Sequence, residues 1–241
     1  MPKDDKHHDA ALNTRIQQVM LRVRAAEKRF GREAGSVQIL PVSKTRPTVD
    51  IEQVAQAGFT EFGENYVREA QKKISALADR NLQWHFIGPI QSNKTHTIAN
   101  LFQWVHSVDR EKIARRLNDQ RPKNLPPLNV CLQINISDEE SKSGIQPSAL
   151  FGLATTIMEL PRIRLRGLMV IPAPSPEFEQ QRQAFRATHE IFDSLKRSLG
   201  DSGTTLDTLS MGMSNDLEAA IAEGATLVRI GTDIFGPRVI T

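Results

Sequence analysis

The sequence predicts an α/β protein, built as a single (β/α)8 TIM-type barrel with an extra N-terminal helix. Short apolar runs alternate with helical patterns along the chain, which is typical of parallel strands joined by helical crossovers. Several runs are apolar on successive residues, as in strands that are covered on both faces. Eight such units in 241 residues fit a closed barrel better than an open doubly wound sheet.

The spacing of apolar residues places the individual elements. Strands are predicted near Val37–Ser43, Phe59–Gly63, Trp84–Gly88, Trp104–Val108, Leu128–Ile136, Leu165–Ile171, Leu206–Met211 and Leu227–Gly231. Helices are predicted between them at Val49–Ala57, Val67–Ala78, Lys94–Leu101, Arg110–Asp119, Ala149–Glu159, Phe178–Leu199 and Asn215–Glu223.

An amphipathic helix at about residues 8–34 precedes the first strand, with Leu12, Ile16, Val19, Met20, Val23 and Ala26 on one face. After the eighth strand only Thr232–Thr241 remain, with Pro237 among them, so a full eighth helix is not expected. The N-terminal helix would cover that side of the barrel instead. No linker or repeat divides the chain, and residues 1–241 are expected to form one domain.

Composition narrows the class of protein. The net charge is +3 and no long basic run occurs, which does not favour nucleic-acid binding. The mixed-sign segments Arg68–Lys73 and Lys112–Arg121 are interpreted as solvated helix faces. The one cysteine, Cys131, lies in an apolar run and is expected to be a buried strand thiol. We expect a cytoplasmic protein without a membrane span, and a monomer, because no broad apolar face is evident.

Lys44 is the first candidate for chemistry, because it follows the carboxyl end of an apolar run that Pro47 then stops. Burial penalises a charged ammonium and therefore favours the free amine, which is the form that bonds to a carbonyl carbon. A surface lysine one residue past the strand is the plainer interpretation of this segment taken alone.

The loops after the seventh and eighth strands are the second candidate, because phosphate often binds there in such barrels. SMGMSND (Ser210–Asp216) leads into a helix that Asn215 could cap, and the Ser214 hydroxyl would add to an anion site at the helix start. The next loop offers Gly231 for close backbone approach and Thr232 for an N–H and a hydroxyl. Two ordinary turns are the alternative, since glycine and serine are common in turns.

Arg229 completes a candidate pocket, because closure of the barrel would place the first strand beside the eighth. Its permanent cation would further favour a neutral Lys44. A lysine amine, a phosphate cradle and an arginine together describe a pocket for pyridoxal 5′-phosphate (PLP). In such a pocket the aldehyde meets the lysine, the phosphate meets the loops, and the arginine faces the ring nitrogen.

Eight segments carry a wider resemblance: VSKTRP (Val42–Pro47), FGENYVREA (Phe62–Ala70), WHFIGPIQSNK (Trp84–Lys94), HSVDR (His106–Arg110), QINISDEESKSG (Gln133–Gly144), LRGLMVIP (Leu165–Pro172), LSMGMSND (Leu209–Asp216) and RIGTDIFGPR (Arg229–Arg238). With them the chain closely resembles the YggS/PROSC-type pyridoxal phosphate homeostasis proteins, which are related to the N-terminal barrel of bacterial alanine racemase. The resemblance covers nearly the whole chain.

The resemblance implies a PLP-binding barrel that acts in vitamin B6 and amino-acid homeostasis, without a general catalytic role. It implies that Lys44 holds PLP as an imine and that Arg229 is the partner of the pyridine nitrogen. It further implies that the phosphate contacts are Ser214, Gly231 and Thr232.

Asn65 resembles a residue near the cofactor, although it could equally be the N-cap of the helix from Val67. His85 could face the barrel interior, where a hydrogen-bonded core histidine is the favoured interpretation. The polar loop Ser137–Gly144 suggests a lid over the site, with a solvated loop as the alternative.

Three functions fit these residues. The first is a non-enzymatic PLP carrier that releases its cofactor to PLP-dependent apoenzymes or free amines. The second is a PLP-dependent amino-acid racemase. Its second base is expected to be missing, because alanine racemases, as the resemblance implies, supply a tyrosine from an additional domain and the sole tyrosine here is Tyr66 at a helix start. The third is a sugar-phosphate aldolase that uses Lys44 as its imine lysine. A pure interaction role would leave the lysine and both loops without a purpose.

Overall fold

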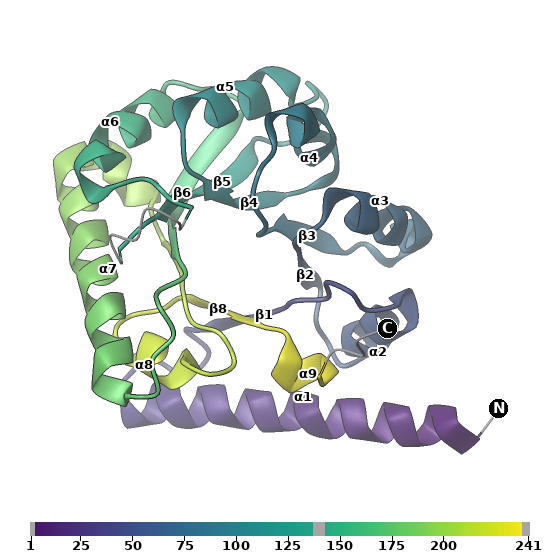
Figure 1. Ribbon diagram of the computed structural model, residues 1–241. Coiled ribbons are helices and arrows are strands. Elements are labelled where there is room, and N and C mark those ends of the chain that lie inside the picture. Colours follow the sequence, from purple (N-terminus) through teal and green to yellow (C-terminus); the bar gives the residue numbers. More distant parts are fainter. Residues whose placement is uncertain (1–2, 137–142, 238–241) are drawn as a thin grey trace.

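The computed structural model describes residues 3–136 and 143–237. Within these ranges eight parallel strands form one sheet, in the order β1-β8-β7-β6-β5-β4-β3-β2 (Figure 1). The strands are β1 (Gln38–Pro41), β2 (Glu61–Glu64), β3 (Gln83–Phe86), β4 (Trp104–Val108), β5 (Leu128–Ile134), β6 (Ile163–Val170), β7 (Thr208–Ser210) and β8 (Leu227–Ile230). A bridge between Val42 and Gly63 joins the two outer strands, so the sheet is a nearly closed barrel. The predicted fold class is confirmed.

Every strand overlaps a predicted apolar run, and β4 has the predicted bounds. The continuous runs arise because a barrel strand is covered by side chains inside the barrel and by helices outside it. In β5 every residue except Asn129 is buried. Cys131 lies in this strand without solvent contact, and burial raises the pKa of its thiol to about 12.

In the described ranges, helices surround the barrel (Figure 1). They are α2 (Thr48–Gln56), α3 (Val67–Ala76), α4 (Thr95–Leu101), α5 (Glu111–Gln120), α6 (Pro147–Met158), α7 (Phe178–Leu199), α8 (Leu217–Ala222) and α9 (Thr232–Phe235), with short 3-10 helices at Ala78–Arg80, Ser92–Lys94 and Gly200–Thr205. As expected, the last crossover helix, α9, is only one turn long. No helix in this part of the chain is long and apolar enough to span a bilayer.

The extra N-terminal helix is α1 (Lys3–Arg29). It ends before the expected boundary near residue 34, because Gly31 adopts a positive φ of 65°, a conformation that commonly terminates helices. Its buried apolar residues include Leu12, Ile16, Val19 and Val23. Figure 1 shows α1 running along α8 and α9, which is the side where the barrel lacks a full helix after β8.

The two mixed-sign segments are not wholly solvated faces, and that interpretation is wrong for two residues. Lys73 is 5% exposed and Arg121 is 4% exposed. Arg121 donates hydrogen bonds to the carbonyl oxygens of Pro126, Ala99 and Phe102 at 2.7–2.8 Å. Each cation is buried because backbone carbonyls or carboxylates replace the water that it loses.

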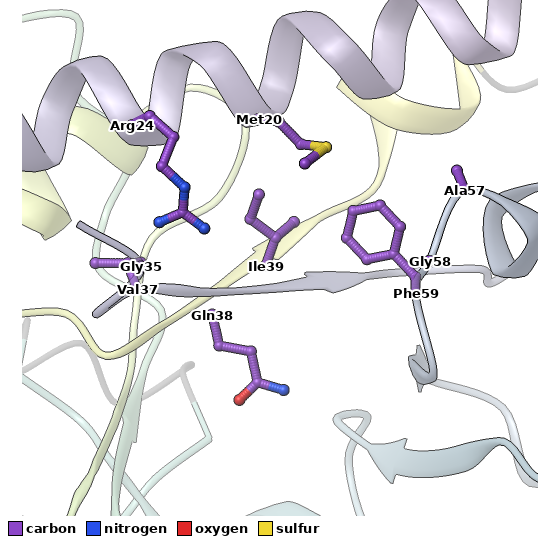
Figure 2. A pocket seen from close by; sticks show the side chains of 9 residues that line it. All are labelled: Met20, Arg24, Gly35, Val37, Gln38, Ile39, Ala57, Gly58 and Phe59. Carbon is purple, nitrogen blue, oxygen red and sulfur yellow. The ribbon is translucent and has the colours of Figure 1, made fainter.

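A cavity of about 330 Å³ lies between α1 and the start of β1. Figure 2 shows Met20 of α1 pointing toward Ile39 and Phe59, and Arg24 pointing toward the segment that carries Gly35 and Val37. This cavity lies at the amino-terminal end of β1, whereas Lys44 follows the carboxyl end of β1. The guanidinium of Arg24 is paired with Glu27 at 2.5 Å, so we assign no ligand to this cavity.

Glu27 ties the end of α1 to the chain that enters β1, and its loss should destabilise the fold. The carboxylate accepts hydrogen bonds from the backbone N–H groups of Gly35 (3.0 Å) and Val37 (2.8 Å). Burial alone would raise the pKa of Glu27, but the hydrogen bonds from Arg24 and these two N–H groups lower it overall. We expect Glu27→Gln to lose about 1–3 kcal/mol of unfolding free energy at neutral pH.

The pH dependence gives this prediction a second test. Because the pKa of Glu27 is lower in the folded state, its stabilisation is present above the unfolded pKa and is lost as pH falls. In urea titrations the gap between wild type and Glu27→Gln should therefore narrow below about pH 4. The exposed Glu33→Gln serves as the control and should match wild type. A gap that is constant with pH would contradict the assignment.

Candidate functional site

The candidate site lies at the carboxyl edge of the barrel, where β1 pairs with β8. Leu40 lies opposite Arg229 in this pairing. Beyond the ladder, Val42 N–H donates to the Ile230 carbonyl at 2.9 Å, and Ser43 N–H donates to the Gly63 carbonyl at 3.0 Å. The segment that leads to Lys44 is thus held between β8 on one side and β2 on the other.

Lys44 stands in a tight turn rather than on a strand. Arg46 N–H donates to the Ser43 carbonyl at 3.1 Å, and Thr45 has a φ of 64°. A β-branched residue in the left-handed region is strained by about 1–3 kcal/mol, and such strain clusters at functional sites. Lys44 itself is half-buried, so one side of the turn is open to solvent. Sequence reasoning did not identify Thr45.

A buried ionic network lies beneath this turn. Lys73 Nζ donates to the Ser43 carbonyl at 2.6 Å, to Glu64 Oε1 at 2.7 Å and to Glu69 Oε1 at 2.6 Å. Ser43 Oγ also donates to Glu64 Oε1 at 2.7 Å, and Glu69 accepts from Thr45 N–H at 2.5 Å. These contacts fix the backbone on both sides of Lys44.

Arg229 points into the barrel mouth. Its Nη1 donates to the Ser210 carbonyl at 2.6 Å and to Ser210 Oγ at 2.9 Å, and its Nη2 donates to the Val170 carbonyl at 2.9 Å. The guanidinium therefore spans the carboxyl ends of β6 and β7. Burial lowers its pKa to about 10, so it remains a cation at neutral pH.

The two predicted phosphate loops lie against each other. Asp233 N–H donates to Ser214 Oγ at 3.4 Å, which links the loop after β7 to the start of α9. Arg22 of α1 contacts both segments. It donates to the Ser214 carbonyl at 3.1 Å and forms ion pairs with Glu218 of α8 and Asp233 of α9. Sequence reasoning did not identify Arg22.

Gly231 offers the clearest test of whether PLP fits these residues. Its φ of −104° suits any residue, and an added Cβ would meet only Val42 O and Val42 Cβ, at 3.6 and 3.7 Å. The described protein atoms therefore do not require glycine at this position, whereas a group lying against the backbone would. Thr232 follows as the first residue of α9.

Asn65 lies after β2 at the same edge of the barrel. It is not a helix cap, because α3 begins at Val67 with Tyr66 as its N-cap and no side-chain cap bond. Its Oδ1 is buried without a hydrogen-bond partner among the described residues. Asn65 and Tyr66 line a groove of about 500 Å³ that also includes Lys94. An orphaned acceptor and the Gly231 surface both fit a polar ligand at this edge.

Two further sequence expectations concern the cap of α8 and a lid over the site. Asn215 does not cap α8, because the helix begins at Leu217 after Asp216, whose Oδ1 accepts from Met213 N–H at 2.6 Å. The lid hypothesis falls on the loop Ser137–Gly144, and residues 137–142 lie outside the described ranges. Among the described residues no group of three His, Cys, Asp or Glu side chains could hold a metal ion.

The fold and the site define a barrel of the alanine racemase type. The family described as alanine racemase, N-terminal domain, matches residues 17–239. A pyridoxal phosphate homeostasis protein of Pseudomonas aeruginosa is 56% identical over 223 residues, which cover 92% of this chain and 94% of that protein. This chain belongs to the family of pyridoxal phosphate homeostasis proteins.

Solved structures agree with this assignment. PipY of Synechococcus elongatus, solved with PLP bound, is 34% identical with a TM-score of 0.78, and the match covers 88% of this chain and 98% of PipY. An alanine racemase of Clostridium difficile has a TM-score of 0.69 at 13% identity, covering 95% of this chain and 57% of the racemase. The second likeness concerns the fold alone.

Proposed function

We propose that this chain is a PLP-binding protein of vitamin B6 and amino-acid homeostasis, that it holds its cofactor through an imine bond to Lys44, and that residues 1–241 act as one domain. The observation that carries the proposal is the pairing of β1 with β8, which brings the Lys44 turn to the same edge as Arg229 and Gly231. The PLP-bound PipY, a relative with the same fold, supports the choice of cofactor.

Each residue has a separate task in this proposal. Lys44 Nζ takes the aldehyde carbon, and the loops that carry Ser214, Gly231 and Thr232 take the phosphate through N–H and hydroxyl donors. When bound, PLP supplies a carbonyl carbon that amines can attack. Asn65 lies at the same edge with an unused acceptor, which suits a donor group of the ligand.

The surroundings of Arg229 favour a carrier over an enzyme. A permanent cation facing the ring nitrogen disfavours protonation of that nitrogen, so the ring is a weaker electron sink. Racemisation also needs a second base on the opposite face of the substrate. The sole tyrosine, Tyr66, is 52% exposed and precedes α3. We therefore propose a carrier, with amino-acid racemisation as the alternative activity to assay.

The proposal extends to partners and location. A carrier would release PLP to free amines or to PLP-dependent apoenzymes in the cytoplasm. Large apolar side chains that are exposed in the described ranges are scattered over different elements: Leu21, Val49, Tyr66, Phe151, Ile171 and Met213. Such scatter supports a monomer, because stable interfaces need a contiguous apolar patch.

Absorbance spectroscopy of the purified protein with added PLP tests the proposal. An imine band that disappears on borohydride treatment, with the pyridoxyl mass on the peptide containing Lys44, is the expected result. Steady conversion of an L-amino acid to its enantiomer would favour the racemase. A protein that gains neither colour nor a pyridoxyl mass would refute PLP binding.

Replacing Gly231 should separate cofactor binding from folding. In Gly231→Ala the added methyl occupies the surface against which the phosphate would lie. We expect about tenfold faster loss of PLP in dialysis and a change of less than about 0.5 kcal/mol in unfolding free energy. Gly152→Ala is the control, because Gly152 is exposed on α6 with no atom within 4 Å of an added Cβ. Equal PLP retention in both variants would contradict the cradle.

A further inference from the structure

A chain of polar side chains, buried except for the partly exposed Glu61, runs through the barrel from Arg229 to Glu61. Arg229 Nη1 donates to Ser210 Oγ at 2.9 Å, and Ser210 Oγ lies 2.8 Å from His106 Nδ1. His106 Nε2 lies 2.9 Å from His85 Nδ1, and His85 Nε2 lies 2.9 Å from Glu61 Oε2. Both imidazoles and Ser210 are buried. The chain thus links five side chains, one from each of the strands β2, β3, β4, β7 and β8.

The acceptor at the Glu61 end orients the protons along this chain. An ionised carboxylate can only accept, so a neutral His85 turns its Nε2–H toward Glu61 and leaves Nδ1 bare. His106 then donates its Nε2–H to His85 Nδ1, and the bare Nδ1 of His106 accepts from the Ser210 hydroxyl. Ser210 Oγ in turn accepts from Arg229, which can only donate. All bonds point from Arg229 to Glu61.

The charges along the chain agree with this direction. Burial lowers the pKa of His85, and burial together with the charges of His85 and Arg229 lowers the pKa of His106 well below its usual value. Both rings are therefore neutral at neutral pH. The close contact with His85 is the main cause that lowers the pKa of Glu61, which stays a carboxylate. The His85–Glu61 contact is short but bent, so the negative charge does most of the orienting.

Trp104 covers His85 at the far end of the chain, where Glu61 is partly exposed. Trp104 stacks on His85 with ring centroids 5.3 Å apart and planes 8° apart, and Arg166 lies 4.7 Å above the Trp104 ring. Glu61 also accepts from the side chain of Gln38. These contacts fix the environment of the His85 ring. Apolar side chains could have filled the barrel interior equally well, so packing alone does not account for a polar chain there.

We infer that Glu61, His85 and His106 are positioning residues for Arg229, acting through Ser210. His106 accepts a hydrogen bond from the Ser210 hydroxyl, which turns a lone pair of Ser210 Oγ toward the guanidinium. This contact helps to hold the Arg229 cation across the mouth of the barrel. The inference rests on the proposed function in one respect, namely that Arg229 faces the ring nitrogen of PLP. The orientation of the chain itself is independent of PLP.

The first test is the protonation pattern of the histidines in the PLP-free protein, measured by 15N NMR. We expect His85 and His106 each to carry the proton on Nε2 with Nδ1 bare. Glu61→Leu, which removes the accepting charge, should mix the tautomers of both rings. A proton on Nδ1 of His106 in the wild type would overturn the inference, whatever the cofactor does.

The second test measures Arg229. His106→Leu removes the acceptor for the Ser210 proton, whereas the amide oxygen of His106→Asn restores one near the place of Nδ1. We expect about tenfold faster hydrogen exchange of the Arg229 Nη protons in the leucine variant, and exchange near the wild-type rate in the asparagine variant. The exposed His96→Leu on α4 is the control for substituting a histidine. Equal exchange in His106→Leu and wild type would overturn the positioning role.

The third measurement separates this inference from the proposed function. His106→Leu and Ser210→Ala should each speed loss of PLP by about five- to tenfold, and the double variant should lose it no faster than either, because both act through one contact. Additive losses would contradict the shared contact. If the wild type binds no PLP, the proposed function fails, and the tautomer and exchange results still decide the role of the chain.

Discussion

Lys44→Ala should eliminate the borohydride-trapped pyridoxyl adduct while leaving the barrel folded. The side chain supplies the amine, and alanine supplies nothing that can bond to an aldehyde carbon. Lys44 is half-buried in a turn whose backbone is held by contacts among Ser43, Glu64 and Lys73, and these contacts remain when the lysine side chain is removed. We expect a change of less than about 0.5 kcal/mol in unfolding free energy and at least tenfold faster loss of PLP, about 1.4 kcal/mol in affinity.

The measurement is mass mapping after reduction, paired with urea unfolding of the same sample. Lys123→Ala, an exposed lysine in the loop before β5, is the control and should trap the adduct as the wild type does. Some noncovalent PLP should remain in Lys44→Ala, because Ser214, Gly231, Thr232 and Arg229 are intact. A pyridoxyl mass on another lysine of the wild type, such as Lys94 in the groove that Asn65 also lines, would refute the assignment.

The barrel was predictable because its signal is local. A strand buried on both faces must be apolar on successive residues, and each such run stands alone in the sequence; β4 was predicted at its observed bounds. The loops after β7 and β8 were predictable for the same reason, since Ser214 and Gly231 follow the strands within a few residues. Where helices begin was harder to predict, because Asn65 and Asn215 are good capping residues that α3 and α8 do not use.

The supporting groups of the site were not predictable from local patterns. Lys73 lies in a mixed-sign helical segment, and sequence spacing does not tell which lysine of that segment turns inward; Lys72 is exposed and Lys73 is buried. Arg22 acts on residues about 190 positions away. The histidine chain joins β2, β3, β4 and β7, so its geometry exists only after the barrel has closed.

Lys73 is the residue whose loss should destabilise the fold most. Glu64 has no solvent contact and its Oε2 has no hydrogen-bond partner in the described part of the chain, so Lys73 is the cation that balances this carboxylate. Removing one partner of a buried ion pair leaves the other charge uncompensated, at about 3–5 kcal/mol. We expect Lys73→Met to lose this much unfolding free energy at neutral pH, and Lys72→Met to match wild type.

The pH dependence should reveal that Glu64 is the cause. Burial raises the pKa of Glu64 in the folded protein, and Lys73 opposes that rise. Without Lys73 the pKa rises further, and a carboxyl group whose folded pKa is raised favours folding at low pH and opposes it as pH increases. The destabilisation of Lys73→Met should therefore shrink as pH falls toward 4 in urea titrations. Adding Glu64→Gln should recover part of the loss at neutral pH, because a neutral amide needs no counter-ion. A loss that neither acid nor Glu64→Gln relieves would show that Lys73 stabilises the fold through Ser43 and Glu69 rather than by balancing Glu64.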